Sequence, residues 1–137
     1  MDDNPADVDL TSEVLRQSRL HFHVHSVKDG VEAVAFLRRK GAYAARPRPD
    51  LVVLDLNLPR KDGREVLAEV KADRELANIP VVIFTTSEAA SDIVRSYELG
   101  ANCYLRKPGN LAEYRAVVQS MADFWLRFAS LPQKEKR

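Results

Sequence analysis

Apolar and polar positions along the chain follow two patterns, short apolar runs and longer segments with helical spacing. Residues 51–54 and 81–84 are apolar at every position, which is typical of parallel strands covered by helices on both faces. Residues 103–105 form a shorter run, and residues 20–25 alternate strictly between apolar and polar side chains. These four segments are the predicted strands.

Segments with apolar residues every three or four positions separate these strands and predict helices. The helices are expected after Asn4-Pro5, over 31–39, after Asp62-Gly63, around 93–97 with Gly100 as the end signal, and from Asn110 onwards. Asn and Asp favour the first position of a helix, and Gly favours the position after its end. Strands that alternate with helices predict an α/β fold, a doubly wound parallel sheet with helices on both faces.

Composition places the chain among single globular domains. Its 137 residues fit one domain at roughly 100–200 residues per domain. With 21 basic and 20 acidic residues the formal charge is +1, so we expect no general nucleic-acid binding. Cys103 is the single cysteine, which excludes an intramolecular disulfide and a cysteine-based metal cluster. No apolar run approaches the roughly 20 residues of a membrane span, and no signal peptide precedes the first acids, so we expect a cytoplasmic domain without membrane contact.

Polar side chains with chemical potential gather at the ends of the predicted strands. Asp55, Thr85 and Lys107 follow the three apolar runs, and Asp2 and Asp3 stand directly before the first helix, where another strand would end. In an open parallel α/β sheet, ligands bind outside the carboxyl ends of the strands. We therefore expect three carboxylates, a hydroxyl and an amine to meet at one edge of the sheet.

This combination of groups indicates phosphoryl transfer. Crowded carboxylates raise one another's pKa unless a cation neutralises them, and Mg²⁺ binds to one or two carboxylates together with phosphate and water. An amine and a hydroxyl suit phosphoryl oxygens, and Asp55 can act as the nucleophile and form an aspartyl phosphate. Each residue alone would more often be a helix cap or a surface charge, but the joint arrangement favours a site.

The motifs around these residues resemble the receiver domain of bacterial response regulators of the chemotaxis type. They are Asp2-Asp3, Leu54-Asp55-Leu56-Asn57-Leu58-Pro59 with Asp62-Gly63, Thr85-Thr86-Ser87 and Lys107-Pro108. The resemblance covers nearly the whole chain and implies a five-stranded parallel sheet in the flavodoxin-like order 2-1-3-4-5. It implies a receiver domain over residues 1–129 and a C-terminal extension over 130–137.

The resemblance assigns a role to each acid of the site. Asp55 would accept a phosphoryl group from the phosphohistidine of a sensor histidine kinase. Asp3, Asp55 and the backbone carbonyl of Asn57 would bind Mg²⁺, and Asp2 would act on the ion through a water molecule. Lys107 would contact the phosphoryl group. A receiver of this kind acts as a switch that supports its own phosphorylation and dephosphorylation, and it is not an enzyme with a separate substrate.

The resemblance also identifies the switch residues. Thr85 would move toward the phosphoryl group, and Tyr104 would follow as the aromatic switch on the last strand. Thr86 and Ser87 flank the pocket and would tune the access of water. The peptide bond before Pro108 is expected to be cis in this family.

More narrowly, the chain resembles small stand-alone regulators that are partnered with bacterial phytochrome kinases. It rests on Asp3-Asn4-Pro5-Ala6-Asp7 after an acidic residue, on Ala101-Asn102-Cys103-Tyr104, and on the aromatic C-terminal extension. It implies a bacteriophytochrome as the candidate kinase and red light as the signal. The alternative is a phosphorylation-independent interaction module that keeps the fold and has lost the chemistry.

The last predicted helix carries more apolar residues than one domain needs. Its apolar residues recur in steps of four and three at Tyr114, Val118, Met121, Trp125 and Phe128, and Phe124 adds a further aromatic ring. We expect a homodimer with Met121, Phe124, Trp125 and Phe128 as candidate contacts. Alternatively, Trp125 and Phe128 fold back onto their own domain.

Three histidines lie on one face of the alternating segment, His21, His23 and His25. Alternate histidines on a strand can share a metal ion, but no acid or cysteine in that strand completes a ligand set. We therefore favour the polar face of an edge strand.

The first strand of a receiver should precede the paired acids, and Met1 stands where that strand should end. Because this strand lies in the middle of the sheet, its removal would unpair two neighbours. We expect that upstream residues are absent from this sequence, the alternative being that another segment or chain fills the gap.

Overall fold

The computed structural model describes residues 1–18 and 23–132. Its sheet has three parallel strands in the order β1-β2-β3, which are β1 (Val52–Leu54), β2 (Val81–Thr85) and β3 (Cys103–Arg106). All five residues of the central strand β2 are buried. The apolar runs in the sequence thus correctly predicted these three strands and their parallel pairing.

Residues 1–2 and the segment 23–27 continue the sheet beyond β1 without forming regular strands. The Met1 nitrogen donates to the Val53 carbonyl at 2.9 Å, and the Asp55 N–H donates to the Met1 carbonyl at 3.0 Å. On the other side, the Asp2 N–H donates to the Val27 carbonyl at 3.1 Å. The spatial order is therefore segment 23–27, residues 1–2, β1, β2, β3, which is the predicted order 2-1-3-4-5.

The predicted strand over 20–25 is wrong for residues 23–25, and residues 19–22 lie outside the described residues. A strand is defined by a ladder of hydrogen bonds with a neighbour. The hydrogen bond from Asp2 to Val27 is a single contact and falls beyond the predicted range. The alternation of side chains is therefore present in the sequence, but no ladder forms over residues 23–25, the described part of the predicted strand.

In the described part of the chain, five α-helices connect and cover the strands. They are α1 (Pro5–Gln17), α2 (Gly30–Leu37), α3 (Gly63–Ala72), α4 (Ala90–Glu98) and α5 (Leu111–Ala122), with a 3-10 turn over Gly41–Tyr43. The side chains of Asn4, Asp29, Asp62 and Asn110 accept hydrogen bonds from backbone N–H groups in the first turns of α1, α2, α3 and α5. Such caps satisfy N–H groups that have no partner within the helix. None of the helices in the described ranges has the length and hydrophobicity needed to cross a membrane.

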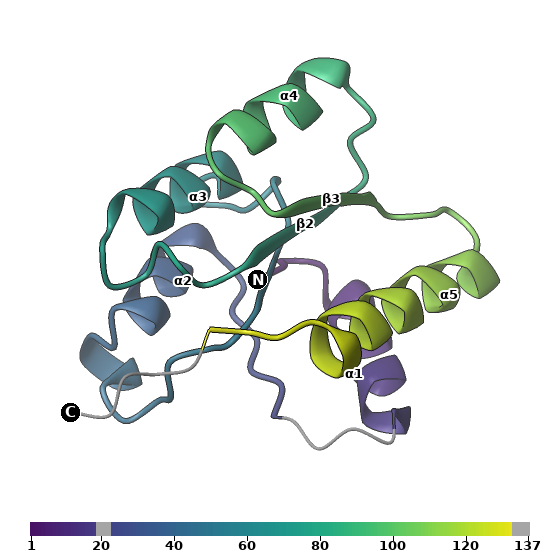
Figure 1. Cartoon of the computed structure of the whole chain (residues 1–137), viewed down its shortest axis with the longest axis horizontal. Helices are drawn as coiled ribbons and strands as arrows, with labels where there is room; N and C mark the ends of the chain where they lie inside the picture. The colour runs from purple at the N-terminus through teal and green to yellow at the C-terminus, as the bar shows by residue number, and fades with distance from the viewer. Residues whose placement is uncertain (19–22, 133–137) are drawn as a thin grey trace.

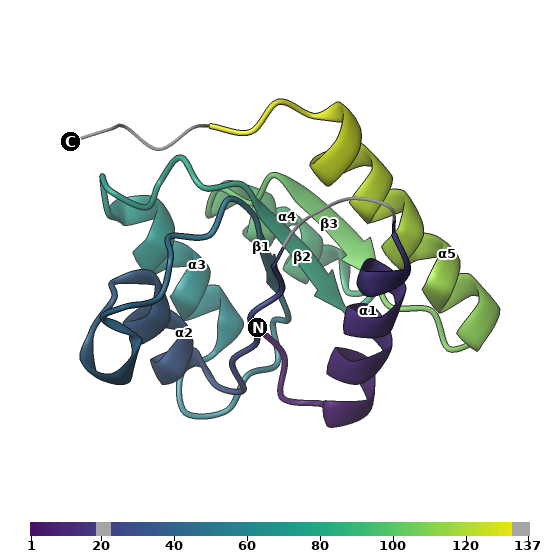
Figure 2. The ribbon, with the colours of Figure 1, turned by 90° about the horizontal axis from the view of Figure 1, so that it is seen from below.

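Two layers of helices enclose the sheet, with α2 and α3 on one face and α1 and α5 on the other (Figure 2). The pleat of β2 serves both layers, because Ile83 belongs to the core under α2 and α3 while Val82 and Phe84 belong to the core under α1 and α5. Each fully buried aliphatic side chain contributes roughly 1.5–3 kcal/mol to stability. In the described residues, the doubly wound fold is thus built on two apolar cores, one on each face of the sheet, with the strands between the two layers of helices (Figure 1).

The C-terminal helix changes its geometry after Ala122. A π-helical turn over Asp123–Phe128 follows α5, and the Ala129 N–H donates to the Phe124 carbonyl at 2.7 Å. A π turn has more residues than an α turn, so the spacing of four and three does not place the last aromatic residues on one face.

This geometry corrects part of the proposed dimer surface. Met121 is buried in the core of its own domain, so it is wrong as a surface contact. Trp125 is half-buried and packs against the same core. Phe124 and Phe128 are 57% and 71% exposed, so these two rings and the half-buried Trp125 stay candidates for contact with a second copy.

Candidate functional site

The predicted polar residues meet at the carboxyl ends of the strands. Asp55 follows β1 directly, Thr85 is the last residue of β2, and Lys107 follows β3. All three side chains are buried, although each is polar or charged. Because buried polar groups are costly unless they are paired, their partners determine what this end of the sheet can do.

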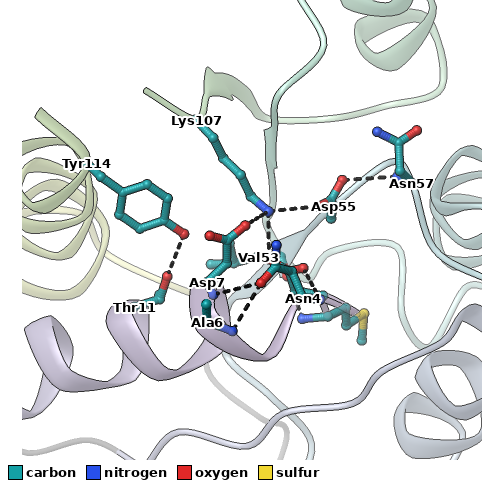
Figure 3. A network of polar contacts seen from close by, with 11 residues as sticks. Asn4, Ala6, Asp7, Thr11, Val53, Asp55, Asn57, Lys107 and Tyr114 are labelled. Carbon is teal, nitrogen blue, oxygen red and sulfur yellow. Dashed lines mark hydrogen bonds and ion pairs between the residues drawn. The ribbon is translucent and has the colours of Figure 1, made fainter. Parts of the chain in front are cut away.

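Lys107 is the centre of the site. Its Nζ atom donates hydrogen bonds to Oδ2 of Asp2, of Asp7 and of Asp55, each at 2.8 Å (Figure 3). Its backbone N–H donates to the Thr85 carbonyl at 2.6 Å, which ties the lysine to the end of β2. An ammonium group has three N–H donors, so the three carboxylates use all of them.

The charge balance of the site is negative. Burial by itself lowers the pKa of Lys107, but its hydrogen bonds to the carboxylates of Asp2, Asp55 and Asp7 outweigh burial and raise this pKa above the ordinary lysine value. The lysine is therefore charged at neutral pH. Asp3 is a fourth carboxylate at the same place, so four acids face one ammonium when all are ionised.

The acidic residues can hold a divalent cation. One carboxylate oxygen from each of Asp2, Asp3 and Asp55 lies within 4.8 Å of the others. Hard cations such as Mg²⁺ and Mn²⁺ take oxygen ligands of this kind, and a cation there would offset the surplus of negative charge. Asn57 is also at this place, because its N–H donates to Asp55 Oδ1 at 3.0 Å. The residues present thus fit a divalent metal ion.

The loop after β1 is held in place by a close contact with α3. The Gly63 N–H donates to the Leu56 carbonyl at 2.9 Å. A Cβ atom on Gly63 would lie 2.3 Å from the Asp55 carbonyl oxygen, a distance that real side chains do not adopt. Glycine at the start of α3 therefore allows the helix to pack directly against the backbone of the proposed phosphoacceptor.

Thr85 presents an unpartnered hydroxyl at the site. Its side chain is fully buried, and its Oγ1 atom has no hydrogen-bond partner among the described residues. A buried hydroxyl without a partner is unfavourable, so this atom is available to an oxygen of a bound group. The next residues face outward, Thr86 exposed and Ser87 half-buried, and the Tyr104 hydroxyl donates to the Ser87 carbonyl at 3.0 Å.

The peptide bond before Pro108 is trans, because none of the peptide bonds in the described part of the chain is cis. The expected cis bond is therefore wrong for this structure. The lysine before this proline is positioned instead by its backbone hydrogen bond to Thr85 and by the three carboxylates around its ammonium group.

Comparison with known families agrees with this geometry. The sequence model of the response regulator receiver domain matches residues 1–119. The chain belongs to the response regulator receiver family. The predicted resemblance to this family and the predicted fold class are thereby confirmed.

The most similar relatives of this receiver include regulators of phytochromes. Response regulator Rcp1 from Synechocystis sp. is 48% identical over 132 residues, which are 96% of this chain and 90% of Rcp1. The Mn²⁺-bound crystal structure of Rcp1 has a TM-score of 0.95 and 47% identity, and covers 97% of this chain and 96% of its own. The phosphorylated cyanobacterial phytochrome response regulator RcpA has a TM-score of 0.94 and 50% identity, with 97% and 95% covered. The bacteriophytochrome response regulator RtBRR has a TM-score of 0.76 and 39% identity, with 96% and 79% covered.

Sequence reasoning missed Asp7 as a member of the site. Asp7 lies in the first turn of α1, three residues after the cap Asn4, where an acid is usually explained by the positive end of the helix dipole. In the structure its carboxylate points to Lys107 (Figure 3). The signal in the sequence was its position on the same helix end as Asp2 and Asp3.

A second missed feature of this receiver connects the loop after β2 with α3 and α4. The Ser87 hydroxyl donates to Asp92 Oδ2 at 2.6 Å, and Arg64 Nη2 donates to Asp92 Oδ1 at 2.7 Å. Arg64 also donates to both carboxylate oxygens of Asp62 at 3.1 Å. The hydrogen bonds from Ser87 and Arg64 lower the pKa of Asp92, so this acid stays ionised and holds the loop.

Neither His23 nor His25, the two histidines that the structure describes, belongs to the site of this receiver. His21 lies outside the described residues, and His23 and His25 are exposed. His25 packs its ring near Phe36, with 5.7 Å between the centroids. Among the described residues the close group of potential metal ligands is the acidic one, and neither histidine is part of it.

Proposed function

We propose that this receiver is a phosphorylation-driven switch of a two-component system, in which Asp55 accepts a phosphoryl group from a sensor histidine kinase. The observation that carries the proposal is the position of Lys107, whose Nζ lies 2.8 Å from Asp55 Oδ2 beside acids that fit a divalent cation. The membership of the chain in the receiver family supports the same reading. We propose Mg²⁺ as the ion, bound by Asp3, Asp55 and the carbonyl of Asn57 directly and by Asp2 through water.

The reaction moves the phosphoryl group from nitrogen to oxygen. A carboxylate oxygen of Asp55 forms a bond to phosphorus while the bond between phosphorus and the kinase's imidazole nitrogen breaks, and the electron pair stays on that nitrogen. Lys107 donates an N–H to an oxygen of the transferred group, and the unpartnered Thr85 hydroxyl donates to another. Asp2, Asp3 and Asp55 would hold a divalent cation, which when bound would supply positive charge to the transferred group. Phosphoryl transfer depends mainly on such positioning and charge neutralisation.

The new charge on Asp55 would be transmitted through the loop after β2. Thr85 and Ser87 are two residues apart, and the Ser87 carbonyl accepts the hydrogen bond of Tyr104. A shift of Thr85 toward the phosphoryl group therefore changes the loop that holds the Tyr104 ring. A local electrostatic change would thus alter the exposed surface around β3 and α4. Thr86 and Ser87 follow Thr85 at the exposed border of the site and would set how quickly water removes the phosphoryl group.

We propose a phytochrome-type histidine kinase as the partner, because the similar structures include regulators named for phytochromes and bacteriophytochromes. We also propose a cytoplasmic homodimer that uses the exposed rings of Phe124 and Phe128 and the half-buried Trp125. Phosphotransfer profiling against the histidine kinases of the source organism tests the partner. Rapid transfer from a light-sensing kinase supports it, and preference for a kinase without a chromophore contradicts it.

Asp55→Asn tests the phosphoacceptor. The wild-type chain should gain one acid-labile phosphoryl group when it is incubated with acetyl phosphate and Mg²⁺, because Asp55 is the buried carboxylate that directly follows β1 and accepts a hydrogen bond from Lys107. The variant should gain none in an intact-mass measurement. Asp50→Asn is the matched control, since Asp50 is exposed at the opposite end of the same strand, and it should be labelled like the wild type. Equal labelling of Asp55→Asn would refute the assignment.

Beryllofluoride separates this function from a phosphorylation-independent interaction module. It mimics a phosphoryl group on a carboxylate and requires the same cation and the same donors. The proposed switch should bind it in the presence of Mg²⁺. A chain that has lost the chemistry should not.

A further inference from the structure

Lys107 makes one hydrogen bond that the proposed function does not explain, the one to Asp7. The Asp7 carboxylate lies on α1 and is separate from the acidic group that fits a cation, which consists of Asp2, Asp3 and Asp55. Its Oδ2 atom nevertheless lies 2.8 Å from Lys107 Nζ, the same distance as those of Asp2 and Asp55. The side chain of Asp7 is 23% exposed and that of Lys107 is 4% exposed, so the pair is largely shielded from water.

The number of donors on the ammonium group makes this contact significant. Three carboxylates accept the three N–H groups of Lys107. A fourth acceptor can bind the ammonium group only if one carboxylate gives up its hydrogen bond. Asp55 would itself carry the phosphoryl group, and Asp2 belongs to the cation site. Asp7 has neither role, so its hydrogen bond is the one that a phosphoryl oxygen would replace.

Lys107 does not need Asp7 to keep its place. Its backbone N–H donates to the Thr85 carbonyl, its Nζ lies 5.9 Å from the centre of the Phe84 ring, and Asp2 and Asp55 accept two of its three N–H groups. Removal of the Asp7 carboxylate therefore frees one N–H donor and leaves the lysine in position.

We propose that Asp7 is a positioning residue that acts through Lys107 and opposes phosphorylation of Asp55. Its carboxylate holds the third N–H of Lys107 and must release it before that N–H can reach a phosphoryl oxygen. Asp7 thus lowers the affinity of the site for a phosphoryl group and sets how far the switch moves toward its phosphorylated state. This inference rests on the proposed function of Asp55.

Equilibrium binding of beryllofluoride at saturating Mg²⁺ tests this role. Asp7→Ala should bind the mimic about 10-fold more tightly than the wild type, because a hydrogen bond to a charged group is no longer given up. Asp7→Asn should show a smaller gain, since its amide oxygen still accepts from Lys107. Asp9→Asn is the matched control, because Asp9 is exposed on the same helix, and its affinity should equal that of the wild type.

The outcomes separate this inference from the proposed function. If the wild type binds no beryllofluoride, the proposed function fails. If the wild type binds and Asp7→Ala binds equally or more weakly, only the role of Asp7 is refuted. An equal gain in Asp7→Asn and Asp7→Ala also refutes it, because charge alone would explain that result. Thermal unfolding of each variant provides a second readout, since a purely structural role would shift the melting temperature and leave the affinity unchanged.

Discussion

Two lysines lie at opposite ends of the same sheet, and their partners differ in charge. At the carboxyl ends of the strands, Lys107 donates to the carboxylates of Asp2, Asp7 and Asp55. At the amino ends, Lys71 donates to the carbonyl oxygens of residues 77 and 79 and to the side-chain amide oxygen of residue 102. Both ammonium groups use three acceptors. Only the acceptors of Lys107 carry charge.

The difference separates a site from a structural contact. Neutral acceptors satisfy Lys71 and leave no surplus charge, so this end of the sheet is complete as it stands. Burial lowers the pKa of Lys71, whereas the carboxylates raise that of Lys107. The acids around Lys107 exceed its single charge, and this surplus attracts a divalent cation. The amino ends of the parallel strands thus hold a structural contact, and their carboxyl ends hold the chemical site.

Replacement of the buried lysine at the site should have the largest effect on stability. Lys107→Met leaves Asp55, Asp2 and Asp7 without their shared cation, and removal of one partner from a buried ion pair costs about 3 kcal/mol or more. We expect a loss of about 3 kcal/mol in EDTA, measured by urea unfolding. The loss should shrink in Mg²⁺, because the carboxylates left without the ammonium group bind the cation more tightly than those of the wild type, and the variant is therefore stabilised more by mass action. A deficit that is independent of Mg²⁺ would contradict the cation site.

The corresponding change at the other end should be smaller and insensitive to metal. Lys71→Met removes hydrogen bonds to the Ala77 and Ile79 carbonyls, and we expect a loss of about 1–2 kcal/mol in the same unfolding experiment. Mg²⁺ should not alter this loss, since no carboxylate is uncovered. If Mg²⁺ reduced the loss of unfolding free energy in Lys71→Met, the two lysines would not differ as the structure indicates.

The two lysines should also respond to alkaline pH with opposite signs, and this is the smallest effect. The pKa of folded Lys107 is raised, so its stabilisation is complete below the ordinary lysine pKa of about 10.4 and declines as the pH rises above it. The pKa of Lys71 is lowered in the folded state. Between this lowered pKa and the ordinary lysine pKa of about 10.4, the unfolded state holds more protons than the folded state, so stability rises with pH in that range. In EDTA, the deficit of Lys107→Met should fall toward high pH while that of Lys71→Met grows. Deficits that change in the same direction would contradict the two shifts.

The sequence predicted the site well where backbone topology alone decides it. Asp55, Thr85 and Lys107 each end a strand, and parallel strands bring their ends together whatever the side chains do. Asp7 was missed because its contact depends on the direction of one side chain from the first turn of α1. A first-turn acid has an adequate local explanation in the helix dipole, and only the structure shows that it faces Lys107.

The ends of elements were harder to predict because they depend on neighbours. The alternating segment 20–25 has the side-chain pattern of a strand, but no hydrogen-bond ladder forms over its described residues. The final helix carries a regular apolar spacing, but its last turn is π-helical. That turn separates the buried Met121 from the exposed Phe128, which the spacing had placed on one face.

The most direct test of the central claim is to locate the phosphoryl group in the wild-type chain. The chain is incubated with acetyl phosphate and Mg²⁺, the acyl phosphate is reduced with borohydride, and the modified peptide is sequenced by mass spectrometry. The account predicts modification at Asp55 alone, lost when EDTA replaces Mg²⁺. Modification at another residue, or labelling at Asp55 that persists without a divalent cation, would contradict it.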